Sequence, residues 1–175
     1  MSEAEFDESL KAGPAAYASK YLGGWSQYET QLASQLNVFS DELSGLGVKI
    51  IKNLDIEELR LIFLDKTVVV VVIFSHWAGR SVEMHGRLVD AEEIVRCVPQ
   101  DFFGIFDICV CRPMFLIERL SRDRQNCTVR HIPVKADPEM WWLYFLCLFR
   151  LLASGNRNYL DATVEVSQAF INWRG

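Results

Sequence analysis

Residues 68–74 read Val-Val-Val-Val-Val-Ile-Phe, and this run indicates the fold class. Seven consecutive apolar residues do not alternate with polar ones, so the pattern is that of a strand buried on both faces. Such strands belong to parallel sheets that helices cover on each side. A second buried strand is predicted over residues 104–111, stopped by Arg112-Pro113, and a third over residues 127–133. We expect the first two runs to be neighbours in one parallel sheet.

Helices and turns are predicted between these strands. Asp55 and Asp90 are placed to cap helices that begin at residues 56 and 91, because a short acidic side chain can accept from free N–H groups of the first turn. The His85-Gly86 pair suggests a tight turn between short strands over residues 81–84 and 87–89. Pro113 fits the first turn of a helix. The remaining predicted elements are a short strand over residues 48–51, an apolar helix over 138–152 and a closing helix over 162–173. Strand alternating with helix predicts an α/β sandwich.

The first 44 residues form a weaker pattern. Helices are predicted near residues 15–21 and from Trp25 to about Leu43, where apolar residues recur at helical spacing. Gly45 and Gly47 then interrupt the chain. We therefore predict a helical N-terminal extension over residues 1–44 and one main domain over residues 45–175.

Composition and charge narrow the classes of partner. The 175 residues are 50% hydrophobic, which excludes general disorder. The net charge of -5 gives no electrostatic basis for nucleic-acid binding. The longest apolar stretch, residues 140–149, is about half of the roughly 20 residues that a membrane span needs. We expect neither nucleic acid nor membrane as a partner. The aromatic residues of the apolar stretch 140–149 are expected to be buried, or in part to form a partner surface.

The cysteines point to a reducing compartment. There are five, an odd number with no framework spacing, at positions 97, 109, 111, 127 and 147. The first ten residues are acidic and lack an apolar core, so no signal peptide is expected. Reduced thiols in the cytoplasm are the natural interpretation.

Two reactive side chains stand at the predicted strand ends. His76 follows the first strand after Ser75, and Cys111 is the last residue of the second. The carboxyl ends of neighbouring parallel strands meet at one edge of a sheet, where working groups gather. A histidine there can take the thiol proton, since the thiolate is the nucleophile. The sequence therefore predicts a Cys-His dyad, although either residue alone is more often structural.

Cys109 is the rival nucleophile, because residues 107, 109 and 111 share one face of a strand. Cys111 is favoured because it lies next to the strand end, whereas Cys109 lies deeper and is expected to be buried. A zinc site using Cys109, Cys111, His76 and His85 is a weaker alternative, since zinc sites prefer two to four residues between paired cysteines. We expect neither metal nor cofactor.

The residues around the dyad resemble a known family. Phe74-Ser75-His76 is similar to the strand-end Ser-His of caspase-like peptidases, and residues 107–112 (Asp-Ile-Cys-Val-Cys-Arg) resemble their cysteine-bearing strand. The gap of 35 residues from His76 to Cys111 is closest to the compact bacterial CHAT branch (caspase and separase related). The resemblance spans residues 48–152. It departs from the family at Trp77, where glycine is common, and at Arg112-Pro113.

The resemblance implies a fold and a function. The fold would be a three-layer caspase-like sandwich, mostly parallel, with helices on both faces of the sheet. The function would be cleavage of a protein substrate in a bacterial defence or cell-death pathway, antiviral defence included, switched by an activating or inhibiting protein partner. Trp77, Asp107 and Arg112 would line the substrate cleft, with Asp107 favouring basic side chains. The alternative is an inactive caspase-like fold that acts as a protein-interaction module.

Overall fold

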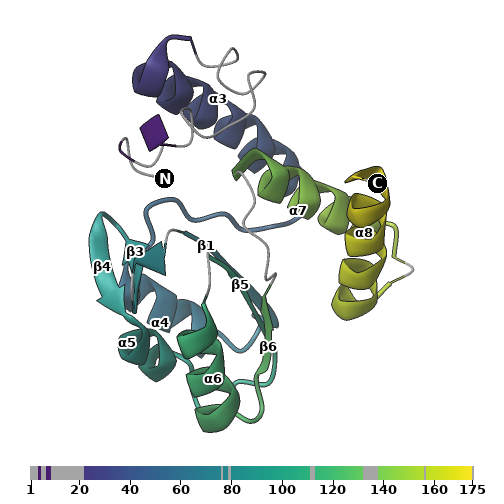
Figure 1. The fold of residues 1–175 in the computed structure, drawn as a ribbon. Coiled ribbons are helices and arrows are strands. Elements are labelled where there is room, and N and C mark those ends of the chain that lie inside the picture. The colour runs from purple at the N-terminus through teal and green to yellow at the C-terminus, as the bar shows by residue number, and fades with distance from the viewer. Residues whose placement is uncertain are drawn as a thin grey trace. The chain divides into compact units, whose positions relative to one another are not determined.

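A computed structural model describes residues 4, 7–8, 22–75, 77–78, 80–110, 113–131, 138–155 and 157–174 (Figure 1). The chain divides into two compact units, which are described separately. Residues 51–135 form the α/β unit, and residues 1–50 with 136–175 form the helical unit. The predicted domains, 1–44 and 45–175, stay a prediction.

A parallel sheet of three strands forms the centre of the α/β unit. Its order is β1 (Val70–Phe74), β5 (Ile105–Cys109) and β6 (Thr128–His131). In the register, Val72 lies opposite Asp107, and Asp107 lies opposite Arg130. The prediction that the first two apolar runs are parallel neighbours is confirmed. The predicted burial of the first run on both faces is wrong, because β1 lies at the edge of the described sheet: Val71 and Ile73 are buried, whereas Phe74 is 41% exposed.

A small antiparallel sheet follows β1 in the chain. It consists of β2 (Trp77–Ala78), β3 (Ser81–Met84) and β4 (Arg87–Asp90). The β3–β4 turn is formed by His85 and Gly86, which both have positive φ, at 49° and 68°. A two-residue turn of this kind matches the right-handed twist of paired strands. The predicted hairpin is therefore confirmed.

Three helices complete the α/β unit: α4 (Ile56–Leu64), α5 (Ala91–Cys97) and α6 (Met114–Asp123). Asp55 caps α4 in a reciprocal capping box with Glu58. Asp90 caps α5 by accepting from the Glu92 amide at 2.8 Å. Both predicted caps are confirmed, because they depend only on residues close in sequence.

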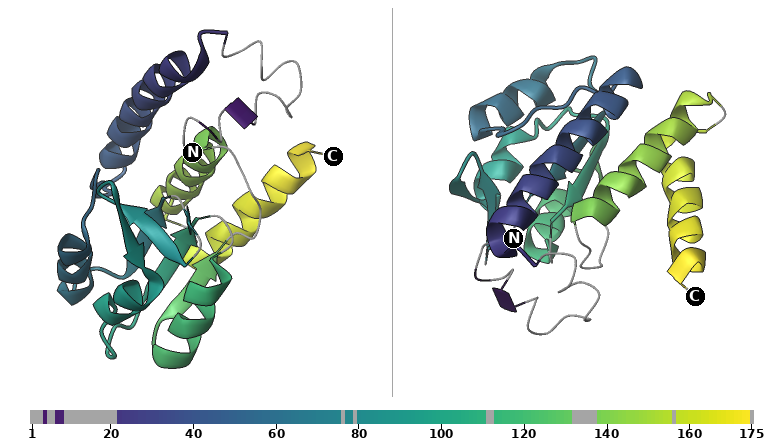
Figure 2. Two further views of the ribbon diagram at one scale, coloured as in Figure 1. Left: turned by 60° about the vertical axis from the view of Figure 1, so that its left-hand side comes forward. Right: turned by 90° about the horizontal axis from the view of Figure 1, so that it is seen from above.

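One apolar core joins the helices of the α/β unit to its parallel sheet. Figure 2 shows the ribbons of these helices and strands from two further sides. The rings of Phe63 on α4 and Phe106 on β5 meet edge to face, with centroids 5.0 Å apart. The sheet contributes buried side chains from alternate positions, and all three helices contribute to the same cluster: Val71, Ile73, Phe106, Ile108, Val110, Leu59, Phe63, Ile94, Val95, Leu116 and Leu120.

The fold is therefore mixed α/β, with a parallel sheet and a small antiparallel one. The three-layer sandwich with helices on both faces is not confirmed. The strand order does not favour helices on both faces. Helix α5 lies in the crossover from β1 to β5 and α6 in the crossover from β5 to β6, and both crossovers advance in the same direction across the sheet. Right-handed crossovers that advance in one direction place their helices on one face of a sheet.

The strand predicted over residues 48–51 is wrong, because these residues have no strand conformation. The Val48 amide donates instead to the Leu43 carbonyl at 3.1 Å. Gly47, with φ 81°, lies in the same turn. The Val48 amide thus pairs with a carbonyl at the C-terminus of the preceding helix, as in common C-terminal capping motifs.

The helical unit contains α3 (Gly24–Gly45), α7 (Pro138–Ala153) and α8 (Tyr159–Arg174). Aromatic contacts join them, between Phe39 and Trp142 at 5.8 Å and between Tyr144 and Phe170 at 5.6 Å. The burial predicted for the aromatic residues of α7 is seen in Trp141, Trp142, Tyr144 and Phe145. The helix predicted near residues 15–21 lies outside the described residues. Within the described ranges, no helix has the length and apolar character to cross a bilayer.

Candidate functional site

The predicted site lies where β1 and β5 end. Phe74 is paired with Cys109, and the Ser75 amide donates to the Cys109 carbonyl at 3.4 Å. The two strands therefore finish side by side. His76, Cys111 and Arg112 continue the chain from these ends but lie outside the described residues, and the side chain of Trp77 lies outside them too. Their assigned roles stay predictions.

Ser75 joins the end of β1 to the hairpin. Its Oγ donates to the Glu83 carbonyl of β3, while its amide bonds to β5. Beyond it, Trp77 is paired with Val82 of the same strand β3. The chain thus passes from the parallel sheet to the antiparallel one within three residues.

Asp107 is the one predicted site residue whose side chain is described. Its carboxylate is fully buried, and Arg130 Nη1 lies 2.5 Å from its Oδ2. The Arg130 side chain is only 14% exposed. A buried carboxylate needs such compensation, because removing a charge from water is costly. The predicted contact of Asp107 with substrate is untested, but its carboxylate already faces an internal cation.

Cys109 is a buried thiol. The residue is 2% exposed, which agrees with the burial expected for Cys109. Its Sγ donates to Asp107 Oδ1 at 3.7 Å. Burial raises the pKa of this thiol well above its usual value, and the negative charge of Asp107 raises it further. Cys109 is thereby held protonated at neutral pH, which suits a structural thiol rather than a nucleophile.

Cys97 and Cys127 are also buried in the core. Burial is the largest cause that raises the pKa of each thiol to about 11. These two thiols therefore have little thiolate at neutral pH.

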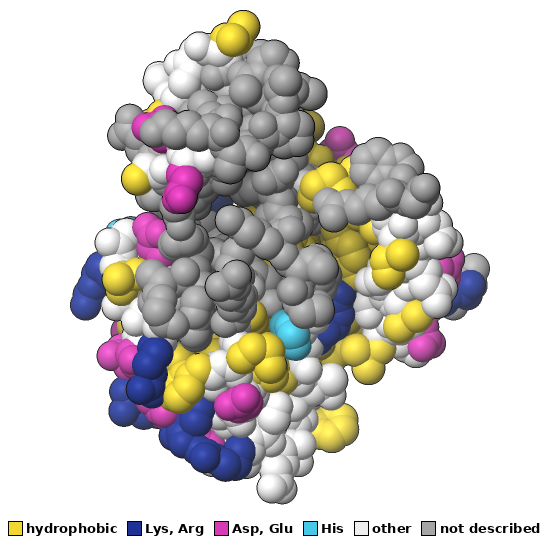
Figure 3. Space-filling view, viewed as in Figure 1, with side chains coloured by type: hydrophobic (Ala, Val, Ile, Leu, Met, Phe, Trp, Pro, Cys, Tyr) yellow, Lys and Arg dark blue, Asp and Glu magenta, His cyan; other side chains and the backbone are white. Residues whose placement is uncertain are grey.

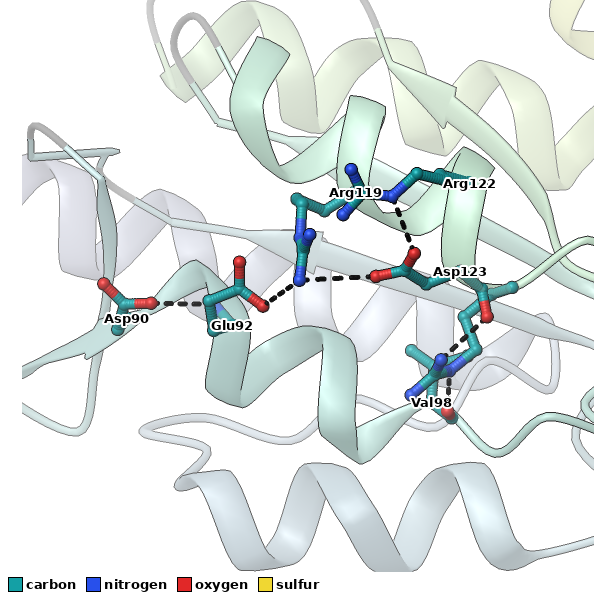
Figure 4. A network of polar contacts seen from close by, with 7 residues as sticks. Asp90, Glu92, Val98, Arg119, Arg122 and Asp123 are labelled. Atoms are coloured by element: carbon teal, nitrogen blue, oxygen red, sulfur yellow. Dashed lines mark hydrogen bonds and ion pairs between the residues drawn. The ribbon is translucent and has the colours of Figure 1, made fainter.

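A polar network fixes α6, the helix that follows the predicted nucleophile (Figure 4). Arg119 Nη2 lies 2.7 Å from Glu92 Oε2 on α5 and 3.4 Å from Asp123 Oδ2. Arg122 also binds Asp123, at 2.9 Å. Just after α6, Arg124 Nε donates to the Val98 carbonyl at 2.5 Å. These contacts join the two helices that flank β5 in the chain.

Sequence reasoning missed Arg130 and the linking role of Ser75. The alternation of β6 could have placed Arg130 on the same face as Asp107, once the strands were known to be neighbours. No comparable signal identifies Glu83 as the partner of Ser75, because the bond goes to a backbone carbonyl.

Other groups on the surface offer little chemistry. In the described part of the chain, no cluster of three His, Cys, Asp or Glu side chains could hold a metal ion. His85 Nδ1 lies 2.7 Å from the Asn53 carbonyl. On the face that Figure 3 shows, basic side chains of the α/β unit lie among acidic ones. Residues 51–135 contain 12 Lys and Arg and 12 Asp and Glu.

Comparisons with known proteins add no identification. No protein-family model, curated protein or solved structure matches this chain.

Proposed function

We propose that this chain is a cysteine endopeptidase of the caspase-like CHAT type, with Cys111 as nucleophile and His76 as base. The observation that carries the proposal is the pairing of β1 and β5. These strands are parallel neighbours, and the hydrogen bond from Ser75 to Cys109 marks their common end. In the sequence, His76 and Cys111 each come two residues after the last residue of these strands.

The proposed reaction is acyl transfer through a thioester. His76 takes the proton of the Cys111 thiol, and the thiolate attacks the carbonyl carbon of the scissile peptide bond. Backbone N–H groups near Trp77 and Cys111 stabilise the oxyanion. His76 then donates its proton to the leaving amine, and water hydrolyses the thioester to release the second product and the free thiol.

The chemistry of three of the four other thiols supports Cys111 as the nucleophile. Cys109, Cys97 and Cys127 are buried and have raised pKa values. Pro113 follows Cys111 by two residues and is the N-cap of α6. A helix start supplies N–H groups and a positive dipole end, which favour a nearby thiolate.

Trp77 and Arg112 are the proposed cleft residues. The Asp107 carboxylate already pairs with Arg130, so we do not expect it to select basic substrate side chains. The substrate is proposed to be a protein in a cytoplasmic bacterial defence or cell-death pathway, with a partner that switches the enzyme. The substrate, the pathway and the switching partner are proposed from the family resemblance alone.

Activity-based labelling tests the proposal. The full chain is treated with biotinylated peptidyl chloromethyl ketones that differ in their P1 side chain, and tandem mass spectrometry locates the modified cysteine. We expect labelling at Cys111 that is lost in Cys111→Ala and slowed about 10²-fold or more in His76→Ala. Cys109→Ala is the matched control and should label normally. Labelling at Cys109 would reassign the nucleophile, and specific labelling at neither cysteine would favour a non-catalytic interaction module.

A further inference from the structure

Position 76 lies between two anchored residues. On one side, the Ser75 amide donates to Cys109 of β5, and the Ser75 hydroxyl donates to the Glu83 carbonyl of β3. On the other side, Trp77 is paired with Val82 of β3. The backbone on both sides of position 76 is therefore tied to the hairpin, and through Ser75 also to the strand that leads to Cys111.

The carbonyl that receives the Ser75 hydroxyl is itself held in place. Glu83 is paired with Leu88 across the hairpin. The hairpin is joined to the rest of the α/β unit at its tip, where His85 Nδ1 meets the Asn53 carbonyl at 2.7 Å. Its base is closed by the Ala91 amide, which donates to the Arg80 carbonyl at 3.0 Å, and Ala91 is also the first residue of α5. The hairpin can thus act as a fixed support for Ser75.

We infer that Ser75 is a positioning residue for His76, and that the β3–β4 hairpin sets the geometry of the base through the Ser75 hydroxyl. This inference rests on the proposed function. The two hydrogen bonds of Ser75 fix the point and the direction in which the chain leaves β1. The inferred consequence of that direction is the orientation of the base in the proposed dyad.

A positioning role of Ser75 differs from a merely structural one in the relative size of its effects on stability and on thiol reactivity. Loss of one neutral hydrogen bond should lower the melting temperature by only a few degrees. A misplaced general base loses part of a contribution that is typically 10²–10⁴-fold. Removing the Ser75 hydroxyl should therefore damage reactivity far more than stability.

The experiment compares chloromethyl ketone labelling of Cys111 across pH in the full chain. We expect Ser75→Ala to slow labelling about tenfold at pH 7. The deficit should vanish at a pH where the thiol ionises without help. Ser75→Thr retains the hydroxyl and should restore the wild-type profile. Asn126→Ala is the matched control, because its Nδ2 also donates to a carbonyl, that of Gln100 at 3.0 Å.

A second variant tests the support from the hairpin side. Gly86 has φ 68° and open space around its missing Cβ, so Gly86→Ala strains the turn without a clash. It should slow labelling in the same pH range while Ser75 is intact. Added to Ser75→Ala, it should have little further effect, because the link to the base is already broken.

The outcomes distinguish this inference from the proposed function. If His76→Ala labels at the wild-type rate, the proposed dyad fails and the positioning role fails with it. If His76→Ala slows labelling but Ser75→Ala and Gly86→Ala both match wild type, only the positioning role is overturned. An equal loss in Asn126→Ala would also overturn it, because the effect would then be general.

Discussion

The two faces of the parallel sheet are both buried near its centre but differ in chemistry. On one face, Phe106 and Ile108 of β5 pack into the core that the three helices share. On the other face, Asp107 pairs with Arg130, and Cys109 donates its thiol proton to Asp107. Hydrophobic burial supplies the free energy on the first face. The second face contains a charged pair, whose net contribution to stability is small or negative compared with apolar residues.

This difference suggests that the polar face specifies the pairing of the strands. Asp107 lies opposite Arg130 in the register of β5 and β6. A slip by one residue would turn Arg130 to the other face of the sheet and leave Asp107 without this cation. The apolar face alone would tolerate rearrangement more readily, because hydrophobic contacts are not directional.

The largest expected effect comes from breaking the charged pair on one side only. Arg130→Ala leaves the buried Asp107 carboxylate without this partner, so we expect a loss of about 3–5 kcal/mol of stability. Hydrogen exchange of the β5 amides measures this loss within the α/β unit. The double variant Asp107→Leu, Arg130→Met should recover most of it. A double variant as unstable as the single one would show that the pair itself is strongly stabilising.

A cavity on the apolar face should cost nearly as much. Leu116 of α6 is fully buried, so Leu116→Ala should lower the free energy of unfolding by about 3 kcal/mol. Leu88 is 63% exposed on the hairpin, and Leu88→Ala should change stability by less than about 0.5 kcal/mol. Urea titration compares the two variants. Equal effects would contradict the assignment of the core.

Thiol reactivity reports on the burial of the apolar core. Cys97 and Cys127 belong to the core and have pKa values of about 11 against an ordinary 9.0. At pH 8 they should react with iodoacetamide roughly 100-fold more slowly than in the unfolded chain, because two pKa units reduce the thiolate that much. Their rates should keep rising with pH up to about 11, as far as circular dichroism shows the chain folded. A plateau near pH 9 would contradict the raised pKa values.

The same thiols link folding to pH. Since folding raises their pKa values, the folded state holds these protons more tightly. Their contribution to stability is complete below pH 9 and is lost as pH rises toward 11. Cys109 should behave in the same direction, since its pKa is also raised.

The smallest expected effect concerns a helix cap. Asp55→Ala removes the bond from the Glu58 amide to Asp55 Oδ1, which is 2.8 Å long, and should cost about 1 kcal/mol. Glu57→Gln weakens only an exposed ion pair with Arg60, so stability should remain near that of wild type. Thermal melts of both variants measure the difference. Equal melting temperatures would show that the cap contributes nothing beyond surface charge.

Part of the fold could be predicted because its causes are local or strongly patterned. The run from Val68 to Phe74 identifies a strand of a parallel sheet by its unbroken apolar character. The caps at Asp55 and Asp90 depend on residues two or three positions away. The His85-Gly86 turn is specified by two adjacent residues. Each of these predictions is confirmed.

What could not be predicted has non-local causes. Whether helices cover one or both faces of a sheet depends on the order in which strands pair, which periodicity does not encode. Arg130 and Asp107 are 23 residues apart and become partners only when β5 and β6 pair. At the candidate site, alternation correctly placed Cys109 on the face of Asp107, and its burial is confirmed. The roles of His76 and Cys111 stay predictions.

The pairing of β1 with β5 also has a consequence for the order of folding. Val70 and Ile105 are paired although 35 residues separate them, whereas His85 and Gly86 alone connect β3 to β4. Hairpins of this length close in microseconds, while distant strands must first lose the entropy of a long loop. The hairpin is therefore expected to form before the sheet whose edge it supports. Once the β3–β4 hairpin has formed, the loop that must close to pair β1 with β5 is effectively shorter. The hairpin is therefore expected to speed the pairing of these two strands.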